Sequence, residues 1–316
     1  MKKYVLVLYF YLSNWTLEAQ QTPLFTQYQE YATIINPAAV TSDYFLNNYN
    51  MSFGASLRQQ WLSLNRNPKT QILRGDYIGR TDNFFNISTG GYFMSDRAGS
   101  TDLTGLYGRL AIIGSNDPQK SGFSLGFSGG LARLSLNVSD VYVRDAADLS
   151  LLQTAKWFPD LGIGLFGYRS LSDKGEGDFI AYGGVSIPQI LGNNIFFQTD
   201  QKQINVSRVR HFYGTAGLVM YVNSQSYFEQ SVWIKYVVGL PIHYDFNLRY
   251  QMMPALKLGV GYSTSQTVHG EASFAFGEGE KRLFRIGYGF DYAFGTEAPF
   301  FGATHEVNLV LLLDNR

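Results

Sequence analysis

Residues 231–249, SVWIKYVVGLPIHYDFNLR, decide the fold class of this chain. Two candidate strands meet at a tight corner, Gly239-Leu240-Pro241. One face carries large apolar side chains, Val232, Ile234, Tyr236 and Val238 and then Ile242, Tyr244, Phe246 and Leu248. The other face carries Ser231, Trp233, Lys235 and Val237 and then His243, Asp245, Asn247 and Arg249. A period of two indicates strands whose faces meet different surroundings, either core and water in a soluble sandwich or lipid and lumen in a membrane barrel.

The composition favours the membrane barrel. Charged residues make up only 16% of the 316 residues, below the roughly 25% of an average soluble protein. Aromatic residues also reach 16%, and there are 33 glycines and no cysteine. After the first segment no run approaches the roughly 20 apolar residues that a spanning helix needs. The net charge is zero, so nothing indicates nucleic acid as a partner. We therefore expect an all-β, transmembrane, antiparallel up-and-down barrel.

The start of the chain predicts export. In residues 1–19, Lys2 and Lys3 precede a short apolar run, 4–12, and Leu17-Glu18-Ala19 offers a cleavage site, as in a secretory signal peptide. An exported chain without a further spanning helix is expected in the cell outer membrane. The prediction divides the chain into this signal peptide, an N-terminal segment at 20–50 and a barrel at 51–316.

The segment 20–50 does not read as strand. Leu24, Tyr28, Tyr31 and Ile35 recur at helical spacing, so a short helix is possible. Asn36-Pro37 should end it, because proline biases the preceding residue away from the helical region. We expect the segment at the periplasmic mouth or inside the lumen, with a flexible leader as the alternative.

From Met51 onward the period of two continues to the end of the chain. About fourteen strands of roughly ten residues follow, the length that a tilted strand needs to cross a bilayer. The candidates are 51–61, 70–79, 84–94, 100–113, 122–132, 161–169, 178–187, 211–222, 227–238, 242–250, 256–264, 267–276, 283–293 and 304–313. Tight turns contrast with long loops at 133–160, 188–210 and 295–303, and 141–152 could form a short helix in the first of these.

Matches to enzyme motifs lack their structural context. Residues 126–130 fit G-x-S-x-G and 162–167 fit G-x-G-x-x-G, but both lie in alternating strands with no helix to follow. Glycines there are better explained by close approach of a neighbouring strand or a plug. The four histidines, His211, His243, His269 and His305, have no partners at metal-site spacing. We expect no catalytic residue, cofactor or metal.

Charged residues fall on the face opposite the apolar one, at Arg58, Lys235, Asp245, Arg249, Arg285 and Asp291. A charge that faces lipid at the bilayer midplane costs about 2–4 kcal/mol, so these side chains should face the lumen. Ion pairs that fill a closed barrel are the favoured interpretation, and a polar pore is the alternative.

A series of short motifs runs through the chain in order: Gln27-Tyr28 with Asn36-Pro37-Ala38, Arg58-Gln59-Gln60-Trp61 with Pro68 and Thr70, Gly90-Gly91 with Asp96-Arg97-Ala98-Gly99, Gly183-Gly184 with Ser186-Ile187-Pro188, Lys235-Tyr236-Val237 with Pro241 and Asp245, Gly287-Tyr288 with Asp291-Tyr292, and His305-Glu306. Together they resemble the PorP/SprF family of Bacteroidota type IX secretion outer-membrane proteins. The resemblance spans nearly the whole mature chain.

The resemblance implies a barrel without catalytic residues that works with type IX secretion or gliding machinery. Its implied partners are outer-membrane lipids, a secreted cargo protein, and the periplasmic ring and lipoprotein of the machine. The motif residues expected in the lumen or in the barrel structure are Arg58, Trp61, Lys235, Tyr236, Pro241, Asp245, Arg249 and Asp291. Those expected to contact a periplasmic partner are Gln27, Tyr28, Asn36 and Pro37.

Three functions compete at this point. The first is a non-enzymatic adaptor, which bulky lumenal side chains and a plugged interior would support. The second is a porin or small-solute transporter, which a wide lumen with unpaired charges would support. The third is a lipid-modifying enzyme, which predicts a serine and a histidine within hydrogen-bond reach at the lipid-facing rim.

Overall fold

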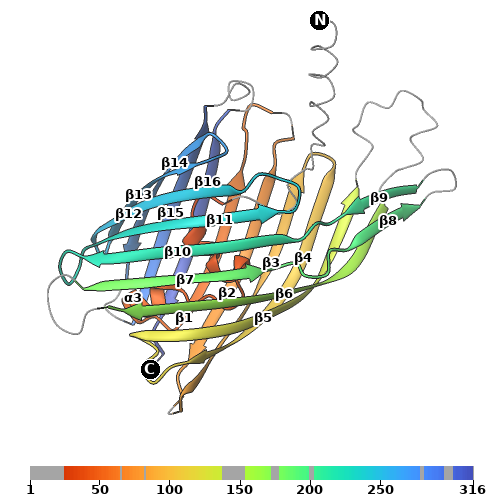
Figure 1. Cartoon of the computed structure of the whole chain (residues 1–316). Coiled ribbons are helices and arrows are strands. Elements are labelled where there is room, and N and C mark those ends of the chain that lie inside the picture. Colours follow the sequence, from red (N-terminus) through yellow and green to blue (C-terminus); the bar gives the residue numbers. More distant parts are fainter. Residues whose placement is uncertain are drawn as a thin grey trace, which may run out of the picture.

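The computed structural model describes residues 25–64, 66–81, 83–136, 154–171, 178–198, 203–277, 281–294 and 302–315. Fourteen of its strands close into an antiparallel barrel (Figure 1). They are β1 (Met51–Gln59), β2 (Lys69–Gly79), β3 (Phe85–Ala98), β4 (Thr101–Gly114), β5 (Ser121–Leu136), β6 (Thr154–Ser170), β7 (Phe179–Ile187), β10 (His211–Tyr221), β11 (Tyr227–Val237), β12 (His243–Met253), β13 (Leu256–Ser263), β14 (Thr267–Phe276), β15 (Arg282–Ala293) and β16 (Thr304–Leu313).

Neighbouring strands of the barrel are neighbours along the chain, with β7 paired to β10 and β1 paired to β16 to close the circle. Closure removes the free sheet edges that would otherwise expose unpaired backbone groups. The fourteen-stranded, up-and-down barrel predicted from the period of two is therefore confirmed.

The two faces of each strand behave as the alternation predicts. In β12, Phe246 and Leu248 are 50% and 44% exposed on the outside, whereas Asp245 and Arg249 are 5% and 3% exposed on the inside. The outer surface of the barrel is thus apolar, and the polar side chains turn to the lumen. Among the described residues, no helix has the length and hydropathy to cross a membrane.

The long connections were predicted less well. β5 continues to Leu136 and β6 begins at Thr154, so much of the expected loop 133–160 is strand. The expected loop 188–210 contains a separate hairpin, β8 (Asn194–Gln198) and β9 (Gln203–Ser207), whose five-residue strands are too short to have been recognised as barrel strands. The signal peptide predicted at 1–19 and the helix predicted at 141–152 lie outside the described residues.

The connections differ between the two ends of the barrel. The three long ones, β5 to β6, β7 to β10 and β15 to β16, lie at one end, here called the long-loop end. The other, the short-turn end, holds the tight connections β10 to β11 and β12 to β13 and the C-terminus. In outer-membrane barrels the short turns face the periplasm.

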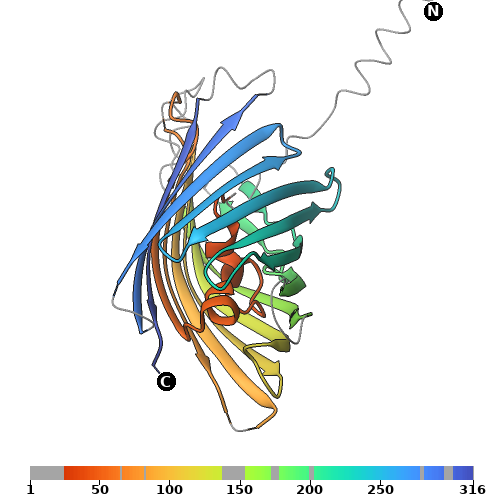
Figure 2. The same ribbon diagram turned by 90° about the vertical axis from the view of Figure 1, so that its left-hand side faces the viewer.

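The lumen is occupied by the N-terminal segment, residues 25–50, here called the plug. It contains η1 (Tyr28–Tyr31), α2 (Ala32–Ile35) and α3 (Ser42–Asn47). Figure 2 shows these helices, in red, enclosed by the strands. α2 ends at Ile35, directly before Asn36-Pro37 as predicted. The plug starts near the long-loop end, runs down the lumen and joins β1 at the short-turn end.

Candidate functional site

The start of the plug is held by a buried carboxylate of the wall. Glu306 of β16, which is 0% exposed, accepts hydrogen bonds from the backbone N–H groups of Thr26 and Gln27 at 2.9 and 3.2 Å. Arg58 lies opposite Glu306 in the sheet and donates to it from Nη1 at 3.1 Å. Arg58 also donates to Thr26 Oγ1. These contacts are charge-assisted hydrogen bonds, which are stronger than neutral ones.

Asp291 of β15 completes this cluster. Its Oδ2 atom lies 2.6 Å from Nη2 of Arg58, and both residues are buried. The prediction that inward charges pair inside the lumen therefore holds at this position. Removing one member of such a buried pair leaves an uncompensated charge and typically costs about 3–5 kcal/mol.

The middle of the plug packs on lumenal glycines. Gly126 of β5 and Gly164 of β6 are cross-strand neighbours. A Cβ atom on Gly126 would lie 2.4 Å from both the carbonyl oxygen of Pro37 and the backbone nitrogen of Ala38. A Cβ atom on Gly164 would lie 2.0 Å from Oδ1 of Asn36. At Gly126 only glycine allows this approach of two backbones. The plug contact expected for the glycines of 162–167 is present at Gly164, where it is made by the Asn36 side chain.

Asn36 is fixed between the wall and its own chain. Its Nδ2 donates to the carbonyl oxygen of Leu165 at 3.0 Å, and its Oδ1 accepts from the backbone N–H of Ala38 at 2.9 Å. On the far side, a Cβ atom on Gly184 of β7 would lie 2.8 Å from Asn36 Nδ2. Asn36-Pro37-Ala38 is therefore the segment of the plug that β5, β6 and β7 hold most closely.

Arg109 of β4 holds the same segment from the other side. Its Nη1 donates to the carbonyl oxygens of Pro37 and Ala39 at 3.1 and 3.4 Å. Its Nε lies 2.7 Å from Asp76 Oδ1, and its Nη2 donates to Ser88 Oγ at 3.0 Å. One guanidinium thus links a carboxylate of the wall to the backbone of the plug.

The end of the plug is held by Arg285 of β15. Its Nη1 and Nη2 contact the two carboxylate oxygens of Asp43 at 2.7 and 2.9 Å, and Nη2 also contacts Glu30 at 2.7 Å. Glu30 in turn pairs with Arg74 of β2 at 2.8 Å. Burial alone would raise the pKa of Asp43, but the charge and hydrogen bonds of Arg285, helped by the charges of Lys257 and Arg74, together outweigh burial and lower this pKa to about 2. Asp43 is therefore a carboxylate at neutral pH.

Aromatic rings fill the space between these polar contacts. Tyr28 of the plug stacks on Trp233 of β11 with ring centroids 5.2 Å apart. Phe45 of α3 stacks on Tyr168 of β6 with centroids 5.1 Å apart. Bulky lumenal side chains, one of the two features expected of the adaptor, are therefore present at both ends of the plug.

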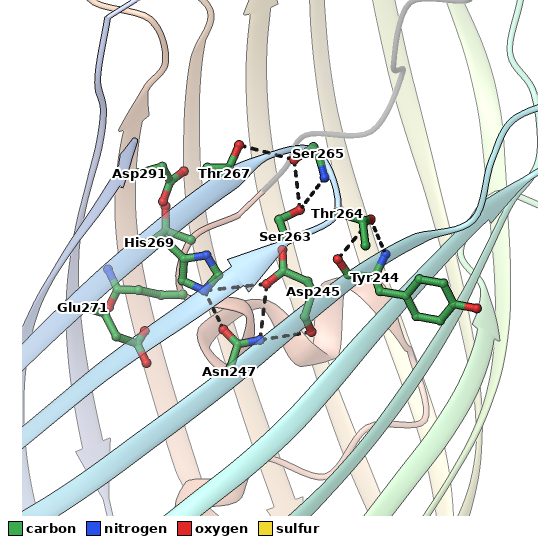
Figure 3. Close-up of polar contacts among 12 residues, drawn as sticks. Tyr244, Asp245, Asn247, Ser263, Thr264, Ser265, Thr267, His269, Glu271 and Asp291 are labelled. Atoms are coloured by element: carbon green, nitrogen blue, oxygen red, sulfur yellow. Dashed lines mark hydrogen bonds and ion pairs between the residues drawn. The ribbon is translucent and has the colours of Figure 1, made fainter. Parts of the chain in front are cut away.

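A second polar cluster lies on the inner face of β12, β13 and β14 (Figure 3). His269 Nε2 lies 2.7 Å from Asn247 Oδ1 and 3.6 Å from Asp245 Oδ1. Further along β12, Arg249 pairs with Glu271 through Nε. Asp245 and Arg249 thus face the lumen as predicted, and they fill it with wall-to-wall contacts.

Lys235 also faces the lumen, where it is 8% exposed. Its cross-strand neighbours are Tyr213 and His243. Among the residues that the structure describes, its ammonium has no hydrogen-bond partner. Among the six charges that the sequence places on the inward face, this lysine is the exception to the prediction that they pair.

Three of the motif residues expected in the lumen or in the barrel structure do not face the lumen. Tyr236 is 38% exposed on the outer face, where its ring lies 6.0 Å from that of Phe212. Pro241 is exposed in the turn between β11 and β12. Trp61 follows β1, with a positive φ of 55° and 36% exposure. All three shape the surface of the barrel, because β1 and β11 end before Trp61 and Pro241 and the strand period turns Tyr236 outward.

The four residues expected to contact a periplasmic partner, Gln27, Tyr28, Asn36 and Pro37, are buried in the lumen. Their contacts are with the wall, as described above. Contact with a partner through these side chains therefore requires the plug to leave the lumen.

A serine and a histidine do lie within hydrogen-bond reach. Ser263 Oγ is 3.1 Å from His243 Nε2. The serine is 4% exposed on the inner face, away from the lipid-facing rim that the enzyme hypothesis required. Asp245 approaches the same Nε2 atom at 3.8 Å, so carboxylate and serine meet one nitrogen and do not flank the ring as in a hydrolase triad. Within the described part of the chain, no His, Asp and Glu cluster could hold a metal ion.

Sequence reasoning missed the plug carboxylates Glu30 and Asp43. A signal for them existed, because Arg74, Arg109 and Arg285 are three inward arginines that need acidic partners. Glu30 and Asp43 belong to the segment 20–50, which was expected at the periplasmic mouth or inside the lumen. The arrangement closes the lumen. The plug is anchored at both ends by ion pairs and hydrogen bonds with the wall, and it occupies the space between the strands.

The chain matches the family described as "Type IX secretion system membrane protein PorP/SprF" over residues 17–311. Among curated proteins, none matches the chain.

Solved structures with a similar fold include two hydrocarbon channels. A TodX deltaS2S3 mutant monoaromatic hydrocarbon channel aligns with TM-score 0.51 and 11% identity over 89% of this chain and 93% of its own. The CymD monoaromatic hydrocarbon channel aligns with TM-score 0.50 and 9% identity over 92% of each chain. At these identities the likeness concerns the barrel fold alone.

Proposed function

The chain belongs to the type IX secretion system membrane protein PorP/SprF family, and we propose that it acts as a non-enzymatic adaptor of that machinery. It is an outer-membrane component of type IX secretion. In the proposed role, the rigid barrel supports secretion or surface attachment of a cargo protein, in secretion or in gliding motility. The barrel would also contact periplasmic partners.

The observation that carries the proposal is the anchored plug. Its start is bound by Glu306 and Arg58, its middle by the glycines of β5 and β6, and its end by Arg285. A plug anchored in this way lies across the path of solutes through the lumen, which favours an adaptor over a porin or small-solute transporter.

The geometry suggests separate surfaces for separate partners. The long connections, which gather at one end, would meet the cargo protein outside the cell. The short-turn end would face the periplasmic ring and lipoprotein of the machine. Gln27, Tyr28, Asn36 and Pro37 would join this second surface only in a state in which the plug has moved.

Conductance of the purified barrel in a planar bilayer tests the role against its main rival. The adaptor should remain closed, with at most brief and small current steps, because the plug keeps its ion pairs at neutral pH. A steady and large ion current from the wild-type protein would contradict the adaptor role and support a porin.

Recovery of the intact outer-membrane complex tests the partners. We expect a tagged barrel, extracted in mild detergent and analysed by mass spectrometry, to bring down periplasmic ring, lipoprotein and cargo proteins of type IX secretion. A matched sample with an unrelated tagged outer-membrane barrel sets the background. Recovery of unrelated porins or lipid enzymes alone would contradict the assignment.

A further inference from the structure

A pocket of about 800 Å³ opens at the short-turn end, between the plug and the wall. The plug contributes the end of α3 and the residues that follow it, and the wall contributes β12 to β15. Its polar lining includes Asn47, Gln251, Lys257, Ser273, Arg285 and Asp314. The volume falls within the range of roughly 300–1,000 Å³ that is typical of ligand sites in proteins.

The charged residues that line this pocket are Lys257, Arg285 and one carboxylate, Asp314. Arg285 is neutralised by Asp43 and Glu30, which it contacts at 2.7 Å each. Lys257 of β13 has no such partner, since it forms no ion pair with any carboxylate of the described chain. Its Nζ atom lies 5.7 Å from the centroid of the Tyr227 ring. One ammonium inside a half-enclosed pocket is therefore available to an anion.

Arg285 adds a second indication. Its two terminal nitrogens are occupied by the plug, but its buried Nε has no hydrogen-bond partner in the described structure. A buried donor without a partner typically costs about 1–3 kcal/mol. An anion in the pocket that reached this Nε would accept its hydrogen bond and remove the cost.

We propose that this pocket binds a carboxylate ligand, with Lys257 as the direct contact and Arg285 as supporting charge. A Lys ammonium is a compact charge with three donors and suits a carboxylate oxygen. The same chemistry is offered by an acidic peptide segment and by a free dicarboxylic acid. Because α3 and its C-terminal residues form one side of the pocket, the ligand touches the plug and the wall together.

Binding at this pocket goes beyond the adaptor role and does not depend on it, since only the folded barrel is needed. A negative result would thus leave the role in secretion untouched, and the recovery of secretion partners is a separate measurement. The pocket shares Arg285 with the plug contacts described above, whereas Lys257 forms none of those hydrogen bonds and ion pairs.

The test measures binding of fluorescent hexaglutamate to the purified, detergent-solubilised barrel by anisotropy, with succinate as competitor and hexalysine as charge control. We expect wild-type protein to bind hexaglutamate and not hexalysine. Lys257→Met, which keeps the length of the side chain and removes its charge, should weaken binding about tenfold or more, as expected for one charged hydrogen bond. Lys257→Arg should restore most of the affinity.

Lys281→Met is the matched control, because Lys281 is exposed in the neighbouring turn at the same end and does not line the pocket. It removes the same charge and should leave affinity within about twofold of wild type, within the usual scatter of single contacts. If succinate competes at a concentration similar to that of hexaglutamate, the site is assigned to free dicarboxylates. If succinate does not compete, the site is assigned to acidic peptides. Either result supports a carboxylate site. The proposal would be overturned if wild-type protein bound neither hexaglutamate nor succinate. It would also be overturned if Lys257→Met and Lys281→Met lost the same amount of affinity for hexaglutamate.

Folding of each variant is checked by the gel shift between unheated and heated samples. If Lys257→Met does not fold, Lys257→Gln provides the same loss of charge. Binding of hexaglutamate and of succinate to Lys257→Gln at wild-type affinity would likewise overturn the proposal.

Discussion

Arg285 of β15 and Asp43 of α3 form a two-point contact, with Nη1 to Oδ1 at 2.7 Å and Nη2 to Oδ2 at 2.9 Å, although 242 positions separate them in the chain. Both residues are buried. The contact joins the last helix of the plug to the next-to-last strand of the barrel. Breaking this contact therefore tests whether the plug can be released while the strands of the wall stay folded.

Asp43→Asn should loosen the end of the plug. The change leaves the Arg285 charge only partly compensated by Glu30, and breaking a buried pair typically costs about 3–5 kcal/mol. We expect channel openings in planar bilayers that are longer and larger than any brief, small current steps of the wild-type barrel. Asp102→Asn, which removes the partner of Arg97 in an exposed ion pair, is the control and should leave the barrel closed. Identical traces for both variants would show that Asp43 does not secure the plug.

Acid should open the lumen only at very low pH. The pKa of Asp43 is lowered from 3.8 to about 2 in the folded protein, so the carboxylate stabilises the plug fully above about pH 4. This contribution is lost as the pH falls from about 4 through 2. Conductance recorded at pH 7, 5, 3 and 2 should rise only in the last two steps, and Asp43→Asn should lose that dependence. A rise between pH 7 and pH 5 would point to another group.

Gly126→Ala should displace the middle of the plug. The added Cβ would lie 2.4 Å from backbone atoms of Pro37 and Ala38, which cannot move aside as a flexible side chain could. Gly129→Ala on the same strand is the control, because its Cβ would make only an ordinary contact with Leu161 at 3.5 Å. We expect faster backbone hydrogen exchange around residues 36–39 in Gly126→Ala alone. Unchanged exchange there would mean that the plug packs less tightly than the structure indicates.

Val260→Arg tests whether the outer face meets lipid. Val260 lies in the middle of β13 and is 63% exposed on the outside. An arginine facing lipid at the midplane should cost about 2–4 kcal/mol, whereas one near the interface costs about 0–1 kcal/mol. Val222→Arg, in the turn after β10, is the depth control with the same chemical change. Urea unfolding in lipid vesicles should give a lower free energy of unfolding for Val260→Arg than for Val222→Arg. Equal free energies of unfolding would contradict a bilayer around β13.

Much of the barrel could be predicted because its information is local. The alternation in residues 231–249 places Asp245 and Arg249 inside and Phe246 and Leu248 outside, and the structure agrees at each position. The local pattern failed where a strand is shorter than a barrel strand or extends into a segment that was expected to be a loop. The five-residue strands β8 and β9 and the extensions of β5 and β6 lie in segments expected to be loops.

The plug contacts could not be predicted in the same way. Sequence motifs singled out Gln27, Arg58, Asp291 and Glu306 separately, yet nothing in their spacing shows that they meet. Arg58 and Glu306 are 248 positions apart and become neighbours only when β1 pairs with β16.

The sequence by itself determined the strand period, the outward apolar face, the inward charges and the end of the short helix before Asn36-Pro37, because each depends on residues close together in the chain. Only the tertiary structure decided that the plug lies in the lumen, which carboxylate pairs with which arginine, and that Lys257 lines a pocket without an ion pair to the described residues. Those outcomes depend on barrel closure, which brings residues from opposite ends of the chain within a few ångströms and removes the water that would otherwise separate their charges.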